Sequence, residues 1–264
     1  MNKIHLLDNG LINKIAAGEV VERPASVVKE LMENSIDAGA TSITVEIAEG
    51  GTSVIKITDN GKGIPKDEIR TAFMRHATSK IDSFEDLENV LTLGFRGEAL
   101  SSIASVAQVE MLTRTENDSM GTRIVINGGV VDREEECAAN VGTVFYVKNI
   151  FFNTPARRKF LKKPATEGSY ISEIVNRIAL GHPNIAIKYI NNGNIVLQTN
   201  GDGNVKNSLF YIYGKDIASK MLNLESEKEG YILKGLVGKP ELSRGNRNYE
   251  NFFINGRFIS MKLI

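Results

Sequence analysis

The stretch from Pro24 to Gly63 constrains the fold most, because a helix pattern, a hairpin pattern and a glycine-rich turn follow one another directly. Residues 24–38 are predicted to form a helix, since their apolar side chains fall on one stripe between a starting proline and a terminating glycine. Two alternating apolar segments follow, at 43–47 and 55–57, and the glycine pair between them is typical of an antiparallel hairpin. A helix with one apolar face beside antiparallel strands indicates an α+β fold.

Apolar patterns beyond residue 63 continue this mixture of helices and strands. Strands are predicted near residues 109–113, 122–126, 144–147, 185–190 and 195–199. Helices are predicted at 84–90, at 98–106, from the Thr154-Pro155 pair onward, and along the stripe of Ile171, Ile174, Val175 and Ile178 that Gly181 ends. We therefore predict an α+β sandwich in which helices cover one face of a mixed, mainly antiparallel sheet.

A glycine-rich linker at residues 201–204 divides the chain. Beyond it, a helix is predicted near 205–213, with strands near 231–237 and 249–254. We therefore expect one domain over residues 1–204 and part of a second over residues 205–264.

Composition excludes several classes of protein. No apolar run approaches the roughly 18 residues that span a bilayer, and the N-terminus lacks the apolar core of a secretory signal. The single Cys137 suits a reducing compartment, so we expect a cytoplasmic protein without membrane contact. The 32 basic and 32 acidic residues cancel, so any nucleic-acid contact must come from a local patch and be sensitive to salt.

Glu30 and Asn34 are the first candidate site residues. They are four positions apart on the predicted helix and so share one face, about one turn from each other. The carboxylate could polarise a water molecule, and the amide oxygen could ligate Mg²⁺. A solvated polar face has the same pattern, so this pair does not decide the function by itself.

Asp59 ends the second hairpin strand and is followed closely by Gly61 and Gly63. A carboxylate fixed there could accept the exocyclic amine of adenine, and the glycines would leave room for a flat ligand. An Asx turn with glycines serving only the backbone explains the same residues.

The loop Gly94-Phe95-Arg96-Gly97 opens directly onto the helix predicted at 98–106. Backbone N–H groups at such a helix start can hold phosphates. The sequence contains neither G-x-x-x-x-G-K-[ST] nor G-x-G-x-x-G, which disfavours the P-loop and dinucleotide-binding folds.

In this order, the motifs resemble those of the GHKL (Bergerat) ATPases. The matching segments are ELMENSIDAG at 30–39, DNGKG at 59–63, HATSK at 76–80 and GFRGEAL at 94–100, with Gly142-Thr143 before a later strand. Two further segments, KIAAGEVVERPASVVKE at 14–30 and FFNTPARRKFL at 151–161, resemble the MutL family of mismatch-repair proteins specifically. The resemblance runs over essentially the whole chain.

The resemblance implies roles for the catalytic and adenine-binding positions of an ATP site. Glu30 would be the general base and Asn34 the Mg²⁺ ligand. Asp59 would bind adenine in a pocket shaped by Gly61 and Gly63. The hydroxyl of Thr143 would support Asp59 through a hydrogen bond.

The phosphate side of the site would come from two loops. Its implied residues are Thr78, Ser79, Lys80, Gly94, Phe95, Arg96, Gly97, Glu98, Ala99 and Leu100. His76 would pack or orient its loop. Arg96 would either touch phosphate or hold the lid formed by residues 94–100.

Two basic regions are either solvated surface or DNA contacts. One is the cluster of Arg157, Arg158, Lys159, Lys162 and Lys163. In the other, the resemblance implies a DNA contact at Arg257, with Arg244 and Arg247 as further candidates. All would touch phosphates rather than read bases. We expect these tail arginines to lie apart from the nucleotide motifs.

The resemblance implies a slow ATPase that acts as a switch in DNA mismatch repair. ATP would order residues 76–100 and promote homodimerisation, which would engage DNA and a mismatch-recognition protein of the MutS type. Two alternatives stay open: an assembly module that binds nucleotide without significant hydrolysis, and a sister ATPase of the chaperone or topoisomerase type. Glu30 favours an ATPase, and residues 151–161 favour MutL.

The resemblance also implies features of the second domain. Residues 205–264 would begin a ribosomal S5-like domain. The lysine that reaches the γ-phosphate in the family would lie beyond Ile264, as would the C-terminal dimerisation region.

Overall fold

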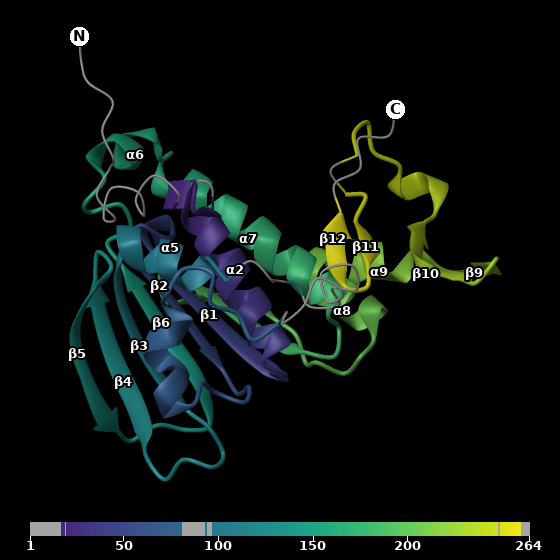
Figure 1. Cartoon of the computed structure of the whole chain (residues 1–264). Helices are drawn as coiled ribbons and strands as arrows, with labels where there is room; N and C mark the ends of the chain where they lie inside the picture. The colour runs from purple at the N-terminus through teal and green to yellow at the C-terminus, as the bar shows by residue number, and fades with distance from the viewer. Residues whose placement is uncertain (1–16, 19, 81–92, 94–96, 248, 260–264) are drawn as a thin grey trace.

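An eight-stranded sheet forms the centre of the computed structural model, which describes residues 17–18, 20–80, 93, 97–247 and 249–259 (Figure 1). The strand order is β5-β4-β3-β6-β2-β1-β7-β8. The strands are β1 (Ser42–Ala48), β2 (Val54–Asp59), β3 (Gln108–Arg114), β4 (Gly121–Asn127), β5 (Val130–Cys137), β6 (Gly142–Lys148), β7 (Ala186–Asn191) and β8 (Asn194–Gln198). β1 and β7 pair in parallel, and the other neighbouring strands described in this sheet pair antiparallel.

Helices cover one face of this sheet. α2 (Pro24–Asp37) contacts β1, β2 and α7 (Pro164–Gly181), while α5 (Ala99–Val106) contacts β3 and β4. The two long helices run side by side across the sheet in Figure 1. Their apolar stripes and the inward side chains of the strands form one buried core. The predicted α+β sandwich with helices on one face is therefore confirmed.

Strand register determines which face of the sheet Asp59 occupies. Ile55 and Ile57 are fully buried beneath the helices, and side chains two positions apart along a strand share a face. Asp59 therefore lies on the helical side, opposite Ile43 on β1 and Thr143 on β6. The end of the hairpin thus brings a carboxylate to the helices.

Short elements connect this framework. They are η1 (Glu49–Gly51), η2 (Lys66–Glu68), α3 (Ile69–Ala72) and α6 (Pro155–Phe160). α6 begins as predicted, but the Thr154 side chain makes no cap hydrogen bond. The helix predicted at 84–90 lies outside the described residues.

β5 was not predicted because its side chains do not alternate between apolar and polar. It is the edge strand of the sheet and is exposed along most of its length. Its pairing with β4 uses backbone groups, and the charges of residues 132–136 protect the edge from further pairing. An edge strand of this kind carries little periodic signal.

The tail forms smaller elements beside the end of α7. They are α8 (Val205–Tyr213), α9 (Lys215–Ser219), β9 (Met221–Lys228), β10 (Tyr231–Gly238), η3 (Pro240–Leu242), β11 (Phe252–Ile254) and β12 (Arg257–Ile259). Leu180 of α7, Leu209 of α8 and Ala218 of α9 form a small core of their own. No helix in the described part of the chain is long and apolar enough to cross a membrane.

Candidate functional site

The polar face of α2 carries the first part of the site. Its stripe of Val27, Val28, Leu31 and Met32 is buried, which turns Glu30, Glu33, Asn34 and Asp37 away from the core. The predicted pair, Glu30 and Asn34, therefore lies on one face of the helix and one turn apart.

Lys29 joins two of these carboxylates. Its Nζ lies 3.1 Å from Oε1 of Glu30 and 2.8 Å from Oε2 of Glu33. Burial raises the pKa of Glu33, and the hydrogen bond from Lys29 opposes that shift. The side chain of Glu30 keeps 25% of its surface exposed, so a water molecule can reach the predicted base.

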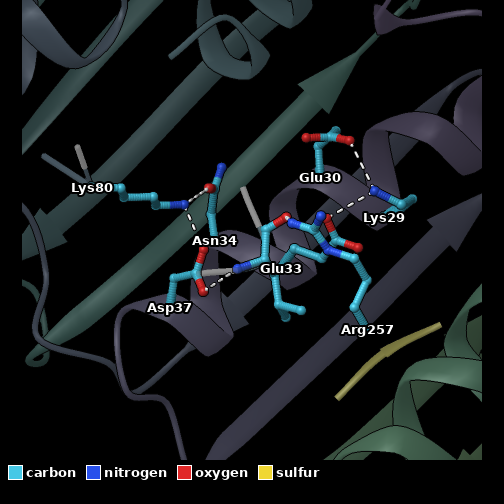
Figure 2. Close-up of polar contacts among 8 residues, drawn as sticks. Lys29, Glu30, Glu33, Asn34, Asp37, Lys80 and Arg257 are labelled. Carbon is cyan, nitrogen blue, oxygen red and sulfur yellow. Dashed lines mark hydrogen bonds and ion pairs between the residues drawn. The ribbon is translucent and has the colours of Figure 1, made fainter. Parts of the chain in front are cut away.

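Lys80 brings the second predicted segment to the same helix. Its Nζ donates to Oδ1 of Asn34 at 3.0 Å and to Oδ2 of Asp37 at 2.6 Å. Figure 2 shows Lys80 pointing at these two side chains, while Lys29 lies between the two glutamates. The predicted Mg²⁺ ligand and Lys80 are thus brought together.

Mg²⁺ would need ligands beyond this helix. Among the described residues, no group of three His, Cys, Asp or Glu side chains could hold a metal ion. Magnesium in nucleotide sites commonly takes one or two protein oxygens and completes its shell with phosphate and water. The single amide oxygen of Asn34 fits that arrangement.

Asp59 faces α2 from the end of β2. Its Oδ2 lies 2.7 Å from the hydroxyl of Ser35, and its Oδ1 accepts the N–H of Gly61 at 2.9 Å. Burial raises the pKa of Asp59, while hydrogen bonds from Ser35, Gly61 and the Thr143 backbone oppose the shift. A carboxylate has about four acceptor positions, so one remains beside these bonds from Ser35, Gly61 and Thr143 to accept an amine.

The two glycines after Asp59 differ in role. A Cβ on Gly61 would stand 3.1 Å from Oδ1 of Asp59 and 2.9 Å from Cβ of Ala38, so a side chain there would fill the space beside the carboxylate. Gly63 has φ of +72°, and a Cβ there would collide with the carbonyl of Arg114. Gly61 therefore leaves the space between Ala38 and the Asp59 carboxylate open, whereas backbone packing requires Gly63.

Thr143 supports Asp59 through its backbone. Its Oγ1 lies 3.1 Å from Oγ1 of Thr113, which also accepts the N–H of Ile64 at 2.9 Å. The predicted hydroxyl bond is thus replaced by a backbone bond, because β2 and β6 pair at this level.

The two predicted phosphate loops meet at Gly97. This residue has φ of +62°, and a Cβ on it would lie 2.6 Å from the carbonyl oxygen of Ala77. Nδ1 of His76 lies 3.4 Å from Oε1 of Glu98, which supports the orienting role expected of His76. Thr78 accepts the N–H of Lys80 at 3.2 Å, and Ser79 is exposed beside it.

The start of α5 completes the described part of these loops. Glu98 is the N-cap residue, and Ala99 and Leu100 form the first turn, with Leu100 packed on the core. Gly94, Phe95 and Arg96 lie outside the described residues.

Ser35 and Asp37 belong to the site although neither was predicted. Ser35 is 4% exposed and faces Asp59, while Asp37 binds Lys80. The helical period could have found Ser35, because it lies one turn after Leu31 on the face that meets the hairpin.

The tail arginines occupy two different places. Arg244 and Arg247 are exposed between η3 and β11. Arg257 donates to the carbonyl oxygen of Leu93 at 2.5 Å. The expectation that Arg257 lies apart from the nucleotide motifs is therefore wrong.

Two family models match the chain. Residues 22–141 match the histidine kinase-, DNA gyrase B- and HSP90-like ATPases, and residues 209–264 match the C-terminal domain of DNA mismatch repair proteins. The first match contains α2 and the Asp59 turn, together with both predicted phosphate loops.

Proteins similar to this chain include several named DNA mismatch repair protein MutL. The chain is 56% identical to the DNA mismatch repair protein MutL of Agathobacter rectalis, over all 264 residues and 41% of that protein. It is 50% identical to MutL of Caldanaerobacter subterraneus subsp. tengcongensis, covering 45% of it. The chain thus spans less than half the length of these relatives.

Solved structures agree with the sequence matches. The Aquifex aeolicus MutL ATPase domain complexed with ADP aligns with a TM-score of 0.72 and 30% identity, over 92% of this chain and 85% of that one. The N-terminal domain of a DNA repair protein aligns with a TM-score of 0.77 over 95% of this chain and 78% of that one, and at 22% identity it supports the fold alone.

Proposed function

Because the chain belongs to the MutL family of DNA mismatch repair proteins and carries its GHKL ATPase domain, we propose that it binds ATP with Mg²⁺ and hydrolyses it slowly as a molecular switch. One observation carries this proposal. α2 holds the predicted base Glu30 and the Mg²⁺ ligand Asn34, and through Ser35 it also contacts the adenine partner Asp59 at 2.7 Å.

Each residue supplies a defined interaction in the proposed mechanism. Asp59 accepts the adenine amine beside Gly61, and Asn34 offers its amide oxygen to Mg²⁺, which neutralises phosphate charge when bound. Glu30 accepts a proton from the attacking water, and Lys29 holds one of its carboxylate oxygens at 3.1 Å. Lys80, the α5 start and Gly97 lie on the phosphate side.

Binding and turnover measured on the same sample test the proposal. Calorimetry with a non-hydrolysable ATP analogue and Mg²⁺ should show binding at one site per chain, and a phosphate-release assay should show slow turnover that EDTA abolishes. Binding without turnover would favour the alternative, an assembly module that uses nucleotide only as a ligand. Absence of binding would contradict both functions.

We further propose that the chain divides near residue 205 into an ATPase domain and a second, DNA-contacting unit. The second family match at 209–264 supports a separate unit, and the small core around Leu209 and Ala218, which includes Leu180 of α7, joins it to the first. Homodimerisation on ATP binding and engagement of a MutS-type protein are proposed from the family alone.

DNA binding should be electrostatic and insensitive to sequence. Arg244→Glu and Arg247→Glu should each weaken binding to two unrelated duplexes alike. Each should also reduce the slope of log affinity against log salt by about 0.9 for every phosphate that the variant no longer neutralises. Fluorescence anisotropy at several salt concentrations measures both quantities.

A matched control is Arg133→Glu, because Arg133 is also an exposed arginine but lies on the distant edge strand β5. It should leave the slope unchanged. An equal effect of all three variants would attribute the weaker binding to net charge, and an effect on one duplex alone would indicate base readout.

A further inference from the structure

Leu93 is held by hydrogen bonds on both sides of its backbone. Its N–H donates to Oδ1 of Asp37 at 3.0 Å, and its carbonyl oxygen accepts from the guanidinium of Arg257 at 2.5 Å. Asp37 belongs to α2, whereas Arg257 belongs to β12 of the tail and is 164 positions from Leu93. Two distant elements therefore hold the residue that immediately precedes the predicted phosphate segment.

Asp37 connects this point to the other phosphate loop. Its second oxygen, Oδ2, accepts from Lys80 at 2.6 Å, and its side chain is only 9% exposed. Lys80 in turn binds Asn34. Charge-assisted hydrogen bonds are strong and directional where solvent is largely excluded. Asp37 therefore fixes where Lys80 and Leu93 lie relative to the end of α2.

Packing on α7 determines where Arg257 lies. Asn255 and Gly256 form the tight turn between β11 and β12, with φ of 50° and 78°. Phe253 packs on Gly181, where an added Cβ would stand 2.8 Å from its ring, and Arg177 lies 4.2 Å from the centroid of the Phe258 ring. The hairpin is therefore docked on a helix of the ATPase domain.

Arg257 also lies near the polar face of α2 that carries Glu30 and Glu33 (Figure 2). Glu33 shares Lys29 with Glu30. Figure 2 shows Arg257 reaching toward Glu33 on the side of α2 that carries these groups.

We infer that Arg257 is a positioning residue of the nucleotide site: with Asp37 it clamps the Leu93 backbone, and so the second unit helps to fix Asp37, which holds Lys80 at the site. This inference rests on the proposed ATP site but goes beyond it. It assigns Arg257 an effect on nucleotide binding that requires no DNA.

The test uses the 264-residue chain without DNA. Calorimetry with a non-hydrolysable ATP analogue should show roughly five- to tenfold weaker binding for Arg257→Ala, less than for loss of a charged hydrogen bond to the nucleotide itself, because Arg257 is exposed and acts through Leu93. Arg257→Lys keeps the charge and one donor direction and should recover part of the affinity. Arg133→Ala, which removes an exposed arginine on the edge strand β5, should leave affinity unchanged.

A double-variant cycle makes the test specific to the clamp. Asp37→Asn should also weaken binding. Both residues position the same backbone, so their effects should not add. The double variant Asp37→Asn, Arg257→Ala should bind the ATP analogue at most about twofold more weakly than whichever single variant has the lower affinity. Hydrogen exchange should show faster exchange at the Leu93 amide in both single variants, and circular dichroism should confirm that each is folded.

Two results would overturn the inference: affinity within twofold of the unmodified chain for folded Arg257→Ala, or effects that add fully in the double variant. Either result leaves the proposed ATP site intact if the unmodified chain binds the analogue. Failure of the unmodified chain to bind would overturn the proposed function, and the inference with it.

Discussion

Replacing Glu30 with alanine should lower ATP hydrolysis by roughly 10²-fold or more while ATP affinity stays within about tenfold, as expected for removal of a general base. The side chain of Glu30 lies on the polar face of α2, one turn before the predicted Mg²⁺ ligand, and is partly open to water. It lies away from Asp59, so the adenine contact should survive. Single-turnover hydrolysis beside calorimetric binding separates the two effects.

Glu33 provides the matched control. It is a carboxylate on the same face of α2 and shares Lys29 with Glu30, but its side chain is only 12% exposed. Glu33→Gln should reduce turnover far less than Glu30→Ala. If the two results were exchanged, Glu33 would be the base. Normal turnover by the Glu30 variant would remove Glu30 from that role.

Asp59→Asn should weaken ATP binding itself, by about 10- to 100-fold, the range expected when a hydrogen bond to a charged acceptor is removed. An asparagine oxygen can still accept from Gly61, and its amide can donate to the Ser35 hydroxyl. The variant should therefore fold, but it would present fewer acceptors to the adenine amine. The carboxylate is costly to bury, as its raised pKa indicates, so its replacement should cost little stability.

A nucleotide without the 6-amino group tests the contact directly. Purine riboside triphosphate should bind the unmodified chain more weakly than ATP, and Asp59→Asn should remove most of that difference. A difference that persists in the variant would show that the amine is recognised elsewhere. Glu46→Gln, on the opposite face of the same hairpin, should leave both affinities unchanged and controls for the removal of a carboxylate.

Local periodicity was enough to predict the framework of this protein. α2 runs from Pro24 to Asp37, within one residue of the predicted end, because its apolar stripe and its terminating glycine are signals carried by adjacent residues. The hairpin of β1 and β2 was predicted for the same reason. β5 was missed, since an exposed edge strand carries no apolar alternation.

The sequence motifs also predicted which residues of the candidate site lie near one another. Glu30 and Asn34 share a helix face as their spacing predicted, and Asp59 reaches the helices because strand alternation places it on the side of Ile57. Their roles in catalysis and binding stay predictions until the variants are measured. Two details differ from the prediction. Thr143 supports Asp59 through its backbone and not through its hydroxyl, and Gly63 is required by close packing against the carbonyl of Arg114.

Only the tertiary structure decided how distant segments meet. The sequence predicts that Asp37 is a polar residue on a solvated helix face. In the structure its carboxylate accepts hydrogen bonds from both Lys80 and Leu93. In the sequence, Arg257 is one of several arginines in the tail. Docking of its hairpin on α7 brings it to the backbone of Leu93. Residue periodicity reports which face of its own element a side chain occupies, whereas these contacts depend on how separate elements pack, which no local pattern encodes.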